Sequence, residues 1–138
     1  MSDLKTRLRV ELEHIERTLA ELPDSQSCVG LSMIELAGVA ALLHSFYNGI
    51  EKLLKDILKA QKILVPEGAN WHRDLVKVAV ERQVIKESTA QALSSYLAFR
   101  HFFVHAYVMD LEGERLETLI QQVNATFEQA KRDIEKFL

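Results

Sequence analysis

Apolar residues recur at helical spacing in long segments of this chain, and this periodicity most constrains its fold. In residues 4–22 and again in residues 116–137, large apolar side chains step by four and three positions, with charged residues between them. Such steps place the apolar side chains on one face of a helix. The second segment keeps this pattern over three heptads, which is typical of a bundle helix or of an intermolecular coiled coil. We favour the bundle helix.

A long helix is predicted after the first one. Ser32 and Glu35 have the spacing of a capping box, which indicates a helix start, and the apolar pattern continues to about Gln61. Its apolar stripe is wide, so we expect burial against more than one partner. Gly49 lies in the middle of this helix, where glycine costs about 1 kcal/mol relative to alanine. We therefore expect another segment to approach closely at this glycine.

Two more helices are expected before the last one. Residues 64–70 form a loop by their proline and glycine, and Asn70 can cap a short helix over residues 71–83. Ser88, with a glutamine three residues later, is expected to start a fourth helix that continues past residue 100. These patterns together predict an all-α, up-and-down antiparallel bundle of four main helices plus a short one.

Length and composition favour one domain over residues 1–138 and exclude several classes of protein. The chain has 138 residues, of which 48% are hydrophobic, and its net charge is −3. That charge argues against a broad basic surface for indiscriminate nucleic-acid binding, so any RNA contact must be local. Cys28 is the single cysteine. We expect a cytoplasmic protein without disulfides, signal peptide or membrane span.

Residues 100–107, with the sequence RHFFVHAY, combine a cation and proton-handling groups among apolar neighbours. The planar guanidinium of Arg100 suits phosphate oxygens, and the imidazole of His105 can take and return a proton near neutral pH. If the third and fourth helices pack together, His72, Arg73 and Lys77 would join them as RNA-binding candidates. A plain surface position remains the alternative for His72.

Three interpretations of this octet stay open. The apolar residues can simply pack, with the polar ones outside. His101 and His105 can instead form a metal site, since residues four apart share a helical face, but no third ligand is near in sequence. The third interpretation is metal-free RNA cleavage, which requires removal of the 2′-OH proton, stabilisation of charge on phosphorus and protonation of the 5′-oxygen. This interpretation expects neither metal nor cofactor.

RNA cleavage by Arg100 and His105 has a geometric condition. Five residues apart on an ideal helix, these two side chains point about 140° away from each other. They can share one phosphate only if the helix distorts or ends near Val104, and a second molecule is the other possible source of the missing neighbour. Glu51, on the second helix, can orient Arg100 or a histidine by a charge-assisted hydrogen bond. A solvent-facing Glu51 paired with Lys55 is the alternative.

The spacing Arg-x4-His-x-Tyr resembles the signature of the HEPN superfamily, and Tyr107 after it resembles the HepT ribonuclease-toxin branch. Residues 46–54 and 70–72 resemble other HepT-like segments, so the resemblance covers roughly residues 4–138. Many relatives have a small polar residue after the arginine. Here that residue is His101, which makes it a supporting candidate beside His105.

The resemblance implies a HEPN-like homodimer whose paired signature segments form one cleft. It implies a ribonuclease toxin of a type VII-like toxin–antitoxin pair that acts on tRNA or mRNA. Its implied partner is an MntA-like nucleotidyltransferase antitoxin, which transfers AMP from ATP to Tyr107 in the cleft. The alternative function is a non-catalytic HEPN module that binds nucleotides or serves as a scaffold for the nucleotidyltransferase. A plain helical interaction protein is the third choice.

Overall fold

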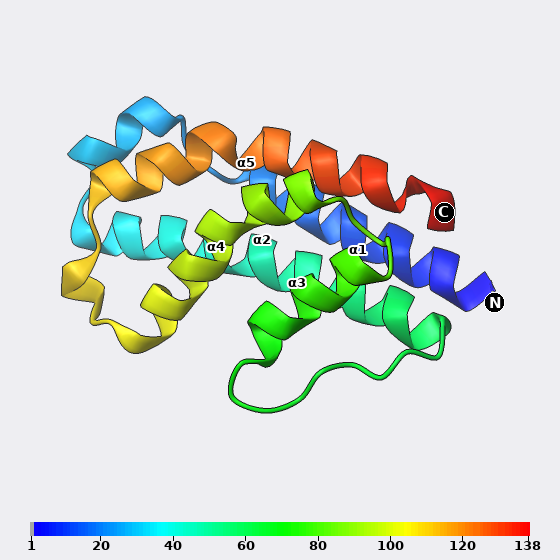
Figure 1. Ribbon diagram of the computed structural model, residues 1–138. Coiled ribbons are helices and arrows are strands. Elements are labelled where there is room, and N and C mark those ends of the chain that lie inside the picture. The colour runs from blue at the N-terminus through cyan, green and yellow to red at the C-terminus, as the bar shows by residue number, and fades with distance from the viewer. Residues whose placement is uncertain (1) are drawn as a thin grey trace.

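The computed structural model describes residues 2–138, which form helices and connections without any strand. In chain order the helices are α1 (Ser2–Ala20), η1 (Ser25–Gly30), α2 (Met33–Ala60), α3 (Trp71–Glu81), α4 (Glu87–His105), η2 (Val108–Asp110), α5 (Gly113–Ile134) and η3 (Glu135–Phe137), where η marks 3-10 helices. The four long helices pass back and forth between the two ends of the molecule, and α3 is the short fifth one (Figure 1). The predicted all-α bundle is confirmed.

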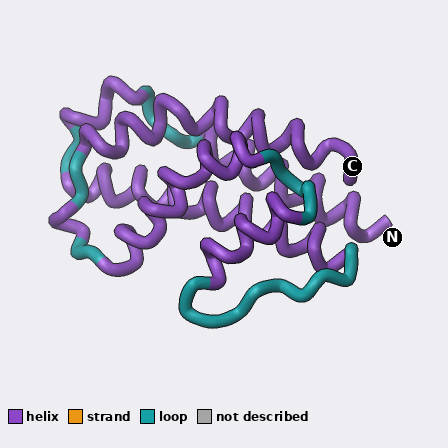
Figure 2. Tube along the Cα trace, in the orientation of Figure 1, coloured by secondary structure: helices purple, strands orange, loops and turns teal. Residues whose placement is uncertain are grey.

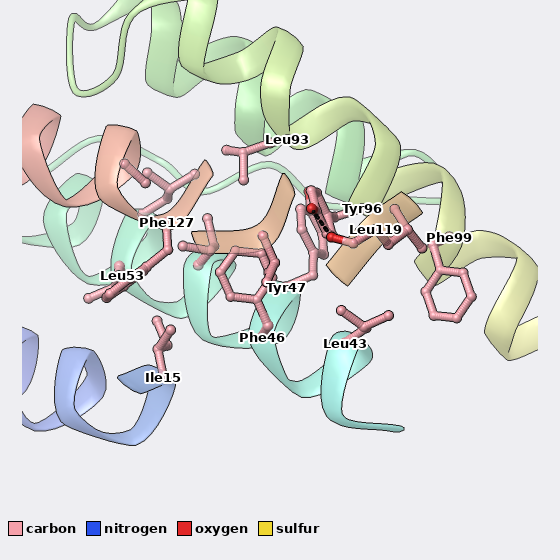
Figure 3. Packing of buried hydrophobic residues seen from close by; sticks show 14 of the residues in the cluster. Ile15, Leu43, Phe46, Tyr47, Leu53, Leu93, Tyr96, Phe99, Leu119 and Phe127 are labelled. Atoms are coloured by element: carbon pink, nitrogen blue, oxygen red, sulfur yellow. Dashed lines mark hydrogen bonds between the residues drawn. The ribbon is translucent and has the colours of Figure 1, made fainter. Parts of the chain in front are cut away.

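The central element is α2, which contacts α1, α3, α4 and α5. Its wide apolar stripe is buried on several sides, and Phe46 packs edge-on against both Tyr96 of α4 and Phe127 of α5 (Figure 3). By length and composition α2 could also cross a membrane, but 44% of its most apolar stretch is buried in the bundle. This burial is what a core helix requires.

The apolar stripe of α5 is buried against the rest of the chain, as the bundle interpretation requires. Val123, Phe127 and Ile134 are each less than 5% exposed. The hydroxyl of Tyr96 donates a 2.6 Å hydrogen bond to the carbonyl of Leu119, which ties α4 to α5 (Figure 3). Burial raises the pKa of Tyr96 to about 12, so its phenol keeps its proton and remains a donor at neutral pH.

The first residues of α2 lie where the sequence predicted them, whereas α4 begins earlier than predicted. Ser32 and Glu35 form the predicted capping box, with bonds of 3.2 and 2.9 Å. Ser88 was expected to cap α4, but the cap is Lys86. The carboxylate of Asp133 on α5 accepts bonds from the Lys86 amide and the Thr89 hydroxyl at 2.9 and 2.5 Å. A distant carboxylate thus caps α4.

Two other expectations need correction. The short helix was predicted to extend to residue 83, but α3 ends at Glu81. Gln83 has a left-handed backbone with φ 60°, which terminates the last turn. Residues 25–30, which were not among the expected helices, form η1, which packs on α5. A Cβ on Gly113 would lie 2.7 Å from the Cys28 carbonyl oxygen, so this glycine lets the two backbones meet.

Gly49 has the role that the sequence predicted. A Cβ built on it would lie 2.6 Å from Cγ1 of Ile15, whose side chain is 2% exposed on α1. No real side chain tolerates that distance without a shift of its neighbour. The missing side chain therefore lets α1 lie close against the central helix.

Candidate active site

A cavity of about 790 Å³ lies between the start of α3 and the C-terminal half of α4. The long loop before α3, drawn in teal in Figure 2, supplies residues 68–70 to its wall. Five of the residues singled out in the sequence line it, and these are His72, Arg73, Arg100, His101 and His105. The expected packing of the third and fourth helices is thus observed, and it brings two guanidinium groups and three imidazoles to one cavity.

The cavity covers a wide face of α4, and this width lets both Arg100 and His105 line it. Its α4 wall also includes Ser94, Leu97 and Val104. On a helix of 3.6 residues per turn, these positions lie between the directions of Arg100 and His105, and Ala98 lies just beyond His105. Both side chains therefore reach one cavity without the predicted distortion. The helix ends at His105, one residue after the expected end near Val104.

His105 is held by the last turn of its own helix. Its Nδ1 lies 2.8 Å from the carbonyl oxygen of His101, and the rings of the two histidines are 4.4 Å apart. A carbonyl only accepts, so Nδ1 must carry the hydrogen. In the neutral imidazole, Nε2 then has the free lone pair and can accept a proton.

His72 is fixed by a buried carboxylate. Both carboxylate oxygens of Glu51 lie within 2.8–2.9 Å of its Nδ1, and Glu51 is only 3% exposed. Trp71 stacks on the His72 ring at 3.5 Å between centroids, and the ammonium of Lys55 lies 3.8 Å from the centre of the Trp71 ring. Lys55 thus contacts the indole, and Glu51 is buried and bonded to a histidine, as one of its predicted roles required, and does not face solvent.

A group of polar atoms is buried beneath Arg100. Its Nε, the hydroxyl of Tyr47 and Nε2 of His44 have no hydrogen-bond partner within residues 2–138. Burial raises the pKa of Tyr47, and the Glu51 carboxylate raises it further, whereas Arg100 opposes the shift. Burial also lowers the pKa of His44, and the charges of Arg100 and His72 add to this effect. These residues therefore form one electrostatic unit.

The sequence analysis missed two members of this unit. His44 and Tyr47 were not singled out as site residues, although they lie seven and four positions before Glu51. Those steps put three ionisable side chains on one face of an otherwise apolar helix. A polar stripe inside the most apolar segment of the chain was the signal that could have identified them.

Two predicted site residues lie elsewhere. Lys77 is exposed and lines a neighbouring groove of about 480 Å³ between α3 and α4, which Arg73 also borders. Tyr107 is 83% exposed on the link between α4 and η2, and among the described residues it is not part of the cavity wall. Tyr107 follows the end of α4 at His105 and the extended Ala106, so its place in a cleft formed by two chains stays a prediction.

Among residues 2–138, no third metal ligand lies beside His101 and His105. His101 and His105 do lie side by side, but residues 2–138 contain no group of three His, Cys, Asp or Glu side chains placed to hold a metal ion. Structural zinc sites usually have four ligands from the protein, and catalytic ones have three. The two stacked imidazoles are thus better explained as part of the cavity wall.

Comparison with known proteins now identifies the family. A family model described as HepT-like protein matches residues 38–138, which include α3, α4, α5 and most of α2. The chain belongs to the HepT-like family. This membership confirms the resemblance stated above and indicates a HEPN-type protein of toxin–antitoxin systems.

A solved structure shares the fold of this HepT-like protein. It is described as a cytosolic protein of unknown function, YutE, from Bacillus subtilis. The two chains are 20% identical and superpose with a TM-score of 0.75, over 97% of this chain and 90% of that one. At this identity the likeness establishes the fold alone. A search of curated proteins found no match.

Proposed function

We propose that this HepT-like protein is a metal-independent endoribonuclease toxin of a type VII-like toxin–antitoxin pair, cleaving tRNA or mRNA in the cytoplasm. The family membership supports the toxin class. One observation carries the catalytic part of the proposal: Arg100 and His105 line the same cavity. A phosphodiester held at the guanidinium edge of this cavity would have an imidazole at the other edge.

The proposed reaction uses the nucleophile that RNA itself carries. Nε2 of His105 takes the proton of the 2′-OH, and the 2′-oxygen forms a bond to phosphorus. Arg100 stabilises the negative charge on the phosphate oxygens, and the bond from phosphorus to the 5′-oxygen breaks as this oxygen takes a proton from a second acid–base group. The products are a 2′,3′-cyclic phosphate end and a 5′-OH end.

We further propose a homodimer that pairs two such clefts. Apolar side chains gather where α4 ends and η2 follows: Val104, Tyr107, Val108 and Met109 are between 45% and 83% exposed. Exposed apolar groups of this kind favour contact with another protein surface. Because Val104 also lines the cavity, a second copy on this surface would lie beside the cleft.

The direct test is incubation of the purified protein with total RNA in EDTA. We expect cleavage to continue in the chelator, because the proposed chemistry uses only side chains. Enzymatic mapping of the product ends should find 2′,3′-cyclic phosphate and 5′-OH groups. Products with 5′-phosphate ends, or activity that depends on added Mg²⁺, would contradict the mechanism.

The proposed antitoxin is an MntA-like nucleotidyltransferase that transfers AMP from ATP to the hydroxyl of Tyr107. The high exposure of this side chain supports the proposal, because a modifying enzyme must reach the hydroxyl. Each attached nucleotide would add phosphate charge two residues after His105. That charge would repel an RNA phosphate near the cleft.

Mass spectrometry after coexpression with such a nucleotidyltransferase tests the modification. We expect Tyr107 to gain one or more AMP groups, and the modified protein to lose RNA cleavage. Tyr107→Phe is the matched control, since it keeps the ring and lacks the hydroxyl that is modified. Inhibition of an unmodified protein would mean that the partner covers the cleft instead.

A further inference from the structure

We infer that His72, positioned by the buried carboxylate of Glu51, is the general acid of the cleft and protonates the leaving 5′-oxygen. This inference rests on the proposed ribonuclease function and adds a residue to it. The sequence analysis drew the second acid–base group from a second molecule and gave His72 only a phosphate contact. Here one chain supplies both groups, with His72 on α3 and His105 on α4.

The surroundings of His72 leave one atom for a ligand. Its Nδ1 is taken by Glu51 at 2.8 Å, and its ring is covered by Trp71 at 3.5 Å between centroids. The side chain is 17% exposed, and the residue lines the cavity. Nε2 lies across the ring from the carboxylate, so it is the nitrogen that a bound substrate can meet.

Glu51 orients this imidazole and gives it a carboxylate partner. A carboxylate accepts only, so Nδ1 carries a hydrogen and Nε2 is left to exchange the second proton. A buried carboxylate that is 3% exposed also needs a positive partner, which an imidazolium provides. The charged form of His72 has a proton on Nε2 to give.

Nδ1 of His105 bonds to a different kind of acceptor than Nδ1 of His72. This difference gives the two histidines different roles. Nδ1 of His105 donates to the neutral carbonyl of His101, which orients the ring without a full negative charge. The neutral imidazole with a free Nε2 is the form of a general base. Two histidines in different environments are thus suited to opposite proton transfers, a division that pairs of titratable groups commonly show at acid–base sites.

One chain can carry out both proton transfers of the proposed step. Neutral His105 takes the 2′-OH proton at Nε2 as the oxygen–phosphorus bond forms. Protonated His72 gives its Nε2 proton to the 5′-oxygen as the bond from phosphorus to that oxygen breaks. The enzyme ends with His105 charged and His72 neutral, and proton exchange with water restores the starting state.

The test compares two RNA dinucleotides, one with the ordinary 5′-oxygen and one with sulfur in its place. A thiolate leaves without protonation because a thiol is far more acidic than an alcohol. We expect His72→Gln to slow cleavage of the oxygen substrate by about 10²- to 10⁴-fold and to cleave the sulfur substrate within about tenfold of wild type. Glutamine keeps an N–H donor for Glu51, so the buried carboxylate retains a partner.

Three comparisons separate this inference from simpler explanations. His105→Gln should lose activity on both substrates, because the 2′-OH proton must be removed in each. Glu51→Gln should show the same split as His72→Gln with a smaller loss, which a merely structural role would not produce. His14→Ala, an exposed histidine on α1, should match wild type on both.

The outcomes distinguish the two proposals. Equal losses on both substrates in His72→Gln, or no loss at all, would overturn the acid role while the ribonuclease function stands. A wild-type protein that cleaves neither substrate nor total RNA would overturn both. In each variant, thermal unfolding followed by circular dichroism checks that the fold is intact.

Discussion

Replacing His105 by alanine is expected to lower the rate of RNA cleavage by about 10³-fold, within the range that general acid–base catalysis contributes. The variant loses the free Nε2 that accepts the 2′-OH proton. Initial rates on a short RNA in EDTA, with wild type and variant at equal concentration, measure the effect. The loss should appear in kcat, because the imidazole acts in the transition state.

The fold should survive this substitution. His105 is exposed at the last residue of α4, and its Nδ1 bond to the His101 carbonyl is worth about 1 kcal/mol. We therefore expect the free energy of unfolding, measured by urea denaturation, to fall by no more than about 1 kcal/mol. A fully active His105→Ala protein would leave the proposed mechanism without its base.

Replacing Arg100 by lysine is expected to reduce kcat/KM by about 10²- to 10³-fold, although the charge is retained. Lysine presents a point charge, whereas the guanidinium offers a planar fork of donors that matches two phosphate oxygens. Arg100→Ala should lose at least as much. Wild-type activity in Arg100→Lys would show that only a diffuse positive charge is required.

A mixing experiment with these variants also tests the proposed dimer. Light scattering should give a mass of twice the 15.8 kDa of one chain. If the clefts work independently, mixtures of Arg100→Ala and His105→Ala proteins stay inactive, because no chain has both groups. Recovery of activity would mean that the two chains share residues across one composite cleft.

Local patterns in the sequence predicted local structure well. The capping box of Ser32 and Glu35 spans four residues, and the close approach at Gly49 needs only a missing side chain in an apolar helix. The boundary at Ser88 failed because its competitor lies on another helix. Asp133, more than 40 residues later in the chain, supplies the acceptor oxygen that caps α4.

In the candidate site, too, the local spacing was predictable from the sequence and the long-range contacts were not. The Arg100–His105 spacing is readable in sequence, and both residues line the cavity. The bond between Glu51 and His72 spans 21 residues, and no local pattern favours that histidine over Arg100 as the partner. The exposed position of Tyr107 outside the single-chain cavity wall was not readable in sequence, because its distance from His105 does not reveal where α4 ends. That boundary depends on the extended backbone of Ala106.

The indole stacked on His72 gives this molecule an optical reporter. Trp71 is the only tryptophan in the chain, and its ring contacts both the imidazole and the ammonium of Lys55. A charged imidazole in van der Waals contact quenches indole emission more strongly than a neutral one does. The intrinsic fluorescence of the unlabelled protein is therefore sensitive to proton gain or loss at the neighbouring ring, which can be followed without any substrate.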